Sequence, residues 1–280
     1  MSGERALAAT GIESMGGSKQ MMRRRIPGAA LLGLLCSLAL AGCQAKPLTV
    51  EESGWALTIA DHYGARAWSR SRTRYLRYDV VVARDGKAPV RIRQILDRGT
   101  GDYRFEADAS EFGDVVGMRD LPPGRLVSLG NRELRVASVW IGQTLQPPEV
   151  HRAVRERLDY DSWWLTFPLD LGATDLHVED RGPTADGTHH LLVRFPGGIE
   201  DEYHLYVDPG TFRIRTTEIV FPDATSERAT WSEPVRLNGV TLQLRRRLPD
   251  RTLKFENVAL TANVRGATLR EPEAEMHDAR

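Results

Sequence analysis

Residues 103–108 read YRFEAD, with apolar side chains at positions 103, 105 and 107 and charged side chains at the positions that follow them. Successive side chains of a β-strand point to opposite faces of a sheet. The alternation therefore predicts a strand that is buried on one face and exposed to water on the other.

The same alternation recurs through most of the chain and predicts a mainly β protein. Turn residues separate the apolar-alternating stretches, among them Asp85-Gly86, a pair that favours a tight hairpin. In the last stretch the alternation slips between Phe255 and Val258, which predicts a bulge near Glu256-Asn257. We expect ten or so antiparallel strands. The stretches that carry the pattern are 76–82, 90–96, 103–108, 125–129, 134–141, 174–179, 189–195, 202–207, 212–221, 227–235, 240–248 and 252–264.

Two helices complete the expected elements. Thr49 to Glu52 match a capping box, and Trp55, Ile59 and Tyr63 follow at helical spacing, so a helix is expected from Thr49 to about Trp68. A second is expected over residues 149–160. Strands joined by hairpins imply a meander, and one apolar face per strand implies a sheet that wraps around something or closes as a barrel.

The N-terminal region predicts export. A basic stretch at 21–25 precedes an apolar stretch of about 15 residues, shorter than the roughly 20 that span a bilayer as a helix. The stretch Leu40-Ala41-Gly42-Cys43 resembles the lipobox of bacterial lipoproteins. That resemblance implies cleavage before Cys43 and attachment of lipid to its sulfur, with Cys43 as the lipidation site.

This interpretation divides the chain into five parts. Residues 1–20 are an upstream extension that does not fit a secretion signal, and 21–42 are the lipoprotein signal peptide. Residues 43–48 are a short tether, 49–268 are a single β domain, and 269–280 are a disordered tail.

Composition excludes several classes of function. The whole chain has 38 basic and 38 acidic residues, and removal of residues 1–42 leaves 33 basic and 36 acidic. A net charge of −3 argues against nucleic acid as a partner. With Cys36 removed and Cys43 lipidated, no cysteine pair remains for a disulfide. The lipid would then be the chain's attachment to the membrane.

Three segments resemble the LolA/LolB-like superfamily of lipoprotein carriers and receptors. They are Trp163–Leu169 (WWLTFPL), Leu205–Phe212 (LYVDPGTF) and Arg236–Val240 (RLNGV). The resemblance implies an open, incomplete β-barrel with helices over its concave face. It also implies an apolar cavity for acyl chains, with acyl chains or lipoproteins as partners.

The candidate ligand-binding residues are apolar and come from the two expected helices and the segment that follows the second. His189 and His190 are adjacent on a predicted strand and point to opposite faces, so a metal site is not expected. No nucleophile elbow, zinc-protease or phosphate-loop motif occurs. We therefore expect no enzyme and no cofactor. The candidates are Trp55, Ile59, Leu158, Trp163, Trp164 and Phe167.

The leading hypothesis is a lipid-anchored envelope protein that binds an apolar or acylated ligand in the concavity. Gln44 follows the cysteine, and in enteric-type sorting this favours the outer membrane, facing the periplasm. The alternative is a structural or interaction module with a filled core and no ligand. Trp163 and Trp164 distinguish these two hypotheses: they line an enclosed cavity if a ligand binds there, and they fill it if the core is closed. An enzyme, marked by carboxylates or histidines clustered at a cleft, is the third hypothesis.

Overall fold

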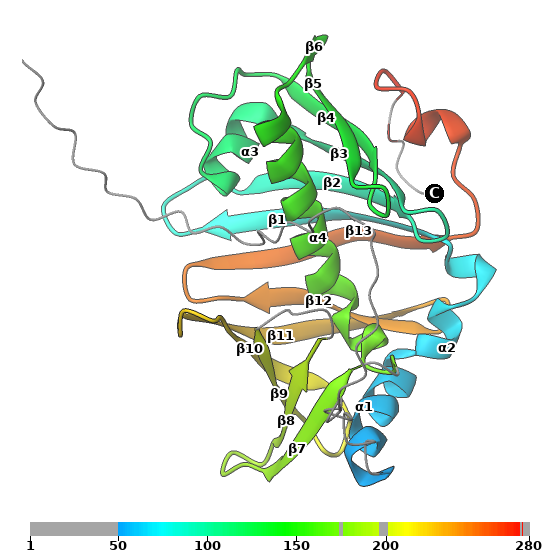
Figure 1. Cartoon of the computed structure of the whole chain (residues 1–280), viewed down its shortest axis with the longest axis vertical. Helices are drawn as coiled ribbons and strands as arrows, with labels where there is room; N and C mark the ends of the chain where they lie inside the picture. Colours follow the sequence, from blue (N-terminus) through cyan, green and yellow to red (C-terminus); the bar gives the residue numbers. More distant parts are fainter. Residues whose placement is uncertain (1–49, 174–175, 196–200, 275, 277–280) are drawn as a thin grey trace, which may run out of the picture. The chain divides into compact units, whose positions relative to one another are not determined.

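Thirteen antiparallel strands form one open sheet in the computed structural model, which describes residues 50–173, 176–195, 201–274 and 276 (Figure 1). The predicted fold class, mainly β with an open sheet, is confirmed. The strands are β1 Tyr75–Arg84, β2 Val90–Asp97, β3 Asp102–Asp108, β4 Arg125–Asn131, β5 Val136–Ile141, β6 Thr144–Leu145, β7 His177–Pro183, β8 His189–Arg194, β9 Glu202–Val207, β10 Ile214–Val220, β11 Ser226–Leu237, β12 Val240–Arg247 and β13 Arg251–Thr261.

Two meanders make up the sheet, where we expected one. The strand order is β6-β5-β4-β3-β2-β1-β13-β12-β11-β10-β9-β8-β7, so the first and last strands pair in its interior. The edge strands β6 and β7 are joined through the long helix α4 (Pro148–Asp170), which Figure 1 shows crossing one face of the sheet. We call the face under α4 the inner face and the opposite face the outer face.

The register confirms the alternation that the sequence predicts. In β1 the side chains of Leu76, Tyr78 and Val80 are fully buried, and Tyr78 pairs with Gln94 of β2 on the inner face. The β1–β13 pairing shifts between Arg77 and Asp79, opposite residues 256–259 of β13. Asn257 has a φ of 51°, so the bulge predicted near Glu256-Asn257 is confirmed.

The first helix is interrupted, where we expected it to be continuous. Helix α1 runs from Val50 to Tyr63 and α2 from Ala65 to Trp68. Gly64 between them has a φ of 89°, a left-handed conformation that glycine adopts at little cost. A Cβ atom here would lie 2.2 Å from the carbonyl oxygen of Gly239. The break therefore lets the chain pass close to the β11–β12 turn.

Replacing Gly64 by alanine is expected to lower the free energy of unfolding by about 2–5 kcal/mol. The left-handed conformation costs about 1–2 kcal/mol, and the displaced backbone at Gly239 adds about 1–3 kcal/mol. Chemical denaturation followed by circular dichroism measures the loss. Gly54→Ala is the matched control, because Gly54 is helical with open space around its Cα and should be neutral or gain up to about 1 kcal/mol. Equal effects of the two substitutions would contradict the prediction.

The other helices differ from the expectation in number and length. The sequence predicted a second helix over 149–160, but α4 continues to Asp170 and includes Pro168. Helix α3 (Ala109–Val116) was not predicted, although Asp108 caps it by accepting hydrogen bonds from the backbone N–H groups of Ser110 and Glu111. Two short 3-10 helices lie at Ser71–Thr73 and Gly266–Leu269.

The C-terminal segment contacts the outer face, where we expected a disordered tail over 269–280. Arg104 of β3 is fully buried, although its place in the alternation predicted an exposed side chain. Its guanidinium donates hydrogen bonds to four backbone carbonyls, those of Thr268, Glu271, Pro272 and Ala274. Residue 275 and residues 277–280 lie outside the described residues.

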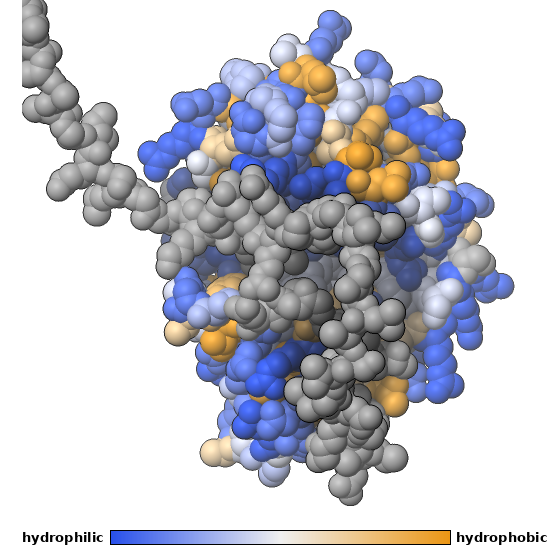
Figure 2. Space-filling model, in the orientation of Figure 1, coloured by the Kyte–Doolittle hydropathy of each residue, from blue (hydrophilic) through white to orange (hydrophobic). Residues whose placement is uncertain are grey.

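Hydrophilic residues predominate among the described residues visible in Figure 2. On the face drawn in Figure 2, hydrophobic residues form separate patches among hydrophilic ones. The exposed large hydrophobic side chains are Leu57, Leu134, Val136 and Leu145. Within the described part of the chain, no helix has both the length and the apolar character that crossing a bilayer requires.

Candidate functional site

Helix α4 presents an apolar and aromatic side to the inner face. Leu158, Trp164 and Phe167 are fully buried, and Trp163 is half-buried. The ring of Trp164 lies 5.8 Å from that of Trp231 on β11, measured between ring centroids. Four of the six predicted site residues thus lie together on α4, at its contact with the sheet.

Pro168 determines the main polar contact of this helix. A proline has no backbone N–H, so the carbonyl four residues earlier, that of Trp164, loses its helical partner. Arg246 of β12 occupies that position, and its Nη2 donates to the Trp164 carbonyl oxygen at 2.5 Å. The guanidinium also stacks on the Trp231 ring at 3.3 Å. The proline therefore frees the acceptor through which the sheet holds the helix.

Three hydrogen-bond donors at this contact have no acceptor among the described residues. They are Nε of Arg246 and Nε1 of both Trp164 and Trp231. Arg246 is fully buried, and burial holds the pKa of its guanidinium well below the usual range. A buried donor without a partner costs about 1–3 kcal/mol. The docked position of α4 is therefore less stable than its apolar packing alone implies.

A second polar contact connects α4 to β1 and β2. The carboxylate of Asp161, fully buried on α4, lies 2.5 Å from Nη2 of Arg157 one turn earlier. It also accepts a hydrogen bond from Nε2 of Gln94 at 2.6 Å, and the Tyr78 hydroxyl donates to Gln94 Oε1 at 2.7 Å. Burial raises the pKa of Asp161, and the charge of Arg157 opposes that effect.

The two predicted residues on α1 lie at a separate contact. Ile59 is fully buried, whereas Trp55 is half-buried and stacks on His189 of β8 at 3.9 Å between ring centroids. Tyr63, at the end of α1, donates to Oε1 of Gln243, and burial raises its pKa to about 12. Cys43, the predicted lipidation site, lies outside the described residues.

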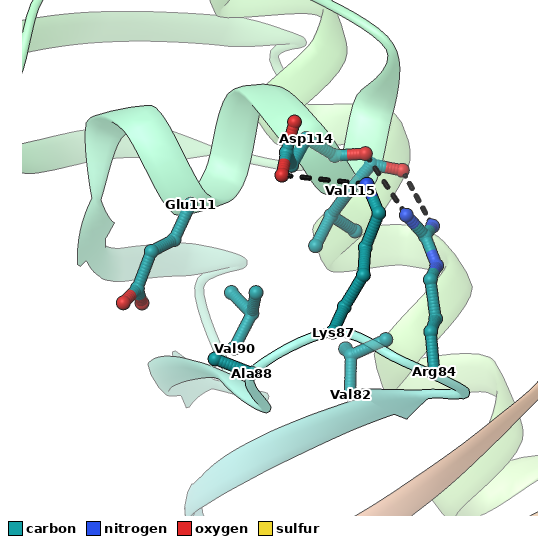
Figure 3. Close-up of a pocket in the computed structure, with 8 residues that line it drawn as sticks. All are labelled: Val82, Arg84, Lys87, Ala88, Val90, Glu111, Asp114 and Val115. Carbon is teal, nitrogen blue, oxygen red and sulfur yellow. Dashed lines mark hydrogen bonds and ion pairs between the residues drawn. The ribbon is translucent and has the colours of Figure 1, made fainter.

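Side chains of the protein itself occupy the space beneath α4. Neither of two surface cavities that the described residues form is lined by Trp163 or Trp164. One, of about 220 Å³, lies between the β1–β2 hairpin and α3 (Figure 3). Its apolar floor includes Val82 and Val90, and at its rim Arg84 donates to the carbonyls of Asp114 and Val115 at the end of α3. The other cavity, of about 440 Å³, is lined by arginines.

Two of the histidines are paired in a way that the sequence could not place. His190 and His204 lie on neighbouring strands of the outer face, with Nε2 of one 2.9 Å from Nδ1 of the other. Burial, and next the charge of His204, lower the pKa of His190. His189 points to the inner face, as its position beside His190 predicts. Within the described residues, no three His, Cys, Asp or Glu side chains are arranged to hold a metal ion.

The chain is similar to solved structures from three bacteria. A DUF1329 family protein of Desulfovibrio piger is 11% identical with a TM-score of 0.49, and the match covers 79% of this chain and 96% of that one. A LolA superfamily protein of Nitrosomonas europaea is 13% identical with a TM-score of 0.43, covering 73% and 93%. A domain of Vibrio parahaemolyticus, described as an outer membrane lipoprotein-sorting protein, is 7% identical with a TM-score of 0.45, covering 79% and 96%.

No family model and no curated protein match the chain. One of these three structures is of a LolA superfamily protein, and three segments of the sequence resemble that superfamily. At these identities the likeness says nothing of a ligand or a partner.

Proposed function

We propose that this protein is a lipid-anchored protein of the cell envelope that binds an apolar or acylated ligand between α4 and the inner face of its open sheet. The observation that carries the proposal is the contact of Trp164, Trp231 and Arg246, where an apolar surface surrounds three buried donors without acceptors. The ligand would displace α4, so its acyl chain would replace the helix on the apolar surface.

An acyl chain would need to displace only the aromatic end of α4, where Trp163, Trp164 and Phe167 pack. Each buried aromatic side chain contributes roughly 1.5–3 kcal/mol and each buried methylene of an acyl chain about 0.8 kcal/mol. About eight methylenes therefore offset the loss of two or three aromatic contacts. The unpaired donors lower the cost of undocking further, since water or a ligand can satisfy them once the helix moves.

The anchor is the second part of the proposal. Leu40-Ala41-Gly42-Cys43 carries it, and six residue steps separate Cys43 from Thr49. At ~3.3–3.6 Å per residue the tether spans roughly 20 Å at most, so the β domain would sit close to the bilayer, on the periplasmic side of the outer membrane. Cys43→Ser should move the protein from the membrane fraction to the soluble fraction. A variant that stays membrane-bound and still incorporates labelled fatty acid would refute the anchor.

A structural or interaction module with a filled core is the second candidate. Its supporting observation is that Leu158, Trp164 and Phe167 are fully buried among side chains of the protein itself. In that case α4 is a permanent part of the core and no acylated ligand binds beneath it.

Titration of the lipid-free Cys43→Ser protein with a long-chain fluorescent fatty acid distinguishes the ligand-binding protein from the filled module. A ligand that needs α4 undocked binds with an apparent affinity proportional to the undocked fraction. Asp161→Asn weakens the docking of α4 away from the tryptophans, so it should tighten binding, by about tenfold for a weakening of ~1.4 kcal/mol. The exposed Asp61→Asn, whose partner is Arg66, should leave binding unchanged.

Two outcomes would count against the ligand-binding proposal. Absence of saturable binding to a folded, lipid-free protein would favour the filled module. Saturable binding that Asp161→Asn leaves unchanged would place the ligand somewhere other than beneath α4.

A further inference from the structure

The cavity of about 440 Å³ is lined by three arginines and by no carboxylate. Its lining residues are Ser69, Arg70, Arg74, Arg98, Gly99 and Thr100. They flank the 3-10 helix between α2 and β1, or lie in the β2–β3 turn. A hollow that brings several guanidinium groups together has the chemistry of an anion site.

Arg98 is fixed in the wall of this cavity. Its guanidinium lies over the ring of Trp68 at 3.2 Å, and Nη1 donates to the carbonyl oxygens of Trp68 and Thr73, each at 2.7 Å. Burial lowers its pKa to about 10, with Asp170 opposing this through space, so it stays charged at neutral pH. These contacts hold the cation in one position before any ligand arrives.

Asp97, an acid beside the cavity, is already neutralised by Arg74. Asp97 is almost fully buried, and Nε and Nη2 of Arg74 donate to its two oxygens at 2.9 and 2.7 Å. The hydrogen bond from Arg74 lowers the pKa of Asp97 to about 2. Asp97 also accepts from the backbone N–H of Gly99 at 2.8 Å. The pair leaves Nη1 of Arg74 outside the bidentate contact.

Arg70 supplies the free charge. Its side chain is exposed, and among the described residues it has no ion-pair or hydrogen-bond partner. The two lining hydroxyls donate elsewhere, that of Ser69 to the Ala65 carbonyl and that of Thr100 to Asp102. The guanidinium groups must therefore carry any anion recognition at this place.

We infer that this cavity binds the phosphate group of a phosphate ester. With Arg74 and Asp97 paired, Arg70 and Arg98 supply the guanidinium groups that would contact the phosphate oxygens of a phosphate monoester or a phospholipid headgroup. Asp170 acts on Arg98 through space and Asp102 accepts from Thr100, so the recognition rests on guanidinium hydrogen bonds and not on a large net charge. Guanidinium groups bind phosphate oxygens through paired, charge-assisted hydrogen bonds. The cavity does not include the α4 contact, so this inference does not depend on acyl binding.

Binding can be measured through the intrinsic fluorescence and the heat of titration of the full-length protein in a nonionic detergent. One arm uses soluble glycerol 3-phosphate, and the other uses the detergent micelles doped with phosphatidylglycerol or, as a comparison without phosphate, diacylglycerol. Saturation with glycerol 3-phosphate assigns a soluble phosphate ester. Saturation with phosphatidylglycerol alone assigns a lipid headgroup, and either result supports the inference.

Variants identify the cavity as the site. Arg70→Gln, at an exposed position that does not contribute to folding, should weaken binding about tenfold, and Arg98→Lys should also weaken it because the planar fork is lost. Arg66→Gln is the matched control, since Arg66 lies in α2, four residues before Arg70, but pairs with Asp61 and does not line the cavity. Absence of saturable binding in both arms would overturn the inference. So would equal weakening by Arg66→Gln and Arg70→Gln, which would indicate diffuse charge attraction.

Discussion

Replacing Trp164 by alanine is expected to lower the free energy of unfolding by about 3–5 kcal/mol, the usual range for removing a buried aromatic side chain. Trp164 is fully buried and contacts the rings of Tyr160, Trp163 and Trp231. Its removal leaves a cavity between α4 and β11, beside the ring of Trp231. The side chain of Arg246 would then remain buried, with fewer packing contacts around it.

Urea denaturation followed by far-ultraviolet circular dichroism gives the free-energy difference. Trp140→Ala is the matched control, because Trp140 is half-buried on β5 and its register partner Val127 belongs to the outer face. It should cost clearly less than Trp164→Ala. A loss below about 1 kcal/mol for Trp164→Ala would show that α4 contributes little to the stability of the folded chain.

The strands were predictable because their signal is local. A half-buried strand alternates every second residue, and this period is visible in β3 and β9 without knowing their neighbours. The bulge at Glu256-Asn257 was visible for the same reason, as a slip in that period. The pairing of β1 with β13 was not predictable, since it joins segments almost 180 residues apart and leaves no trace in either one.

The helices show which features the local sequence predicts and which it does not. The cap of α3 was readable, since Asp108 and Glu111 have the spacing of a capping box, and this signal was missed. The continuation of α4 through Pro168 was not readable, because the carbonyl that the proline leaves free is satisfied by Arg246, 82 positions away in the sequence. A proline in a helical pattern otherwise predicts the end of a helix.

The candidate site was predicted in its apolar part and missed in its polar part. Helical periodicity identified Leu158, and the apolar, aromatic stretch after the expected helix identified Trp164 and Phe167. The structure buries all three between α4 and the sheet. Arg246 and Asp161 gave no such signal, because a charged residue in a strand or helix is normally exposed. Their roles come from partners on other turns or elements: Gln94 on β2, Arg157 on α4, and the Trp164 carbonyl that Pro168 leaves without a helical partner.

Replacing Asp161 by alanine is expected to cost about 3–5 kcal/mol, because it leaves Arg157 as a buried charge without its partner. Arg157 is only slightly exposed, and Asp161 Oδ2 accepts from both its Nε and Gln94 Nε2. The substitution therefore removes one buried anion and strands two donors. Far-ultraviolet circular dichroism during urea denaturation again measures the loss.

The exposed pair of Arg66 and Asp61 provides the control for this prediction. Its side chains are 84% and 50% exposed, so Asp61→Ala should change the free energy of unfolding by no more than about 1 kcal/mol. The double variant Arg157→Met with Asp161→Leu should recover much of the lost stability, since apolar side chains of similar volume often replace a buried ion pair without loss. A double variant less stable than Asp161→Ala would mean that the ion pair is a net source of stability. Its role would then not be to position α4 on β1 and β2.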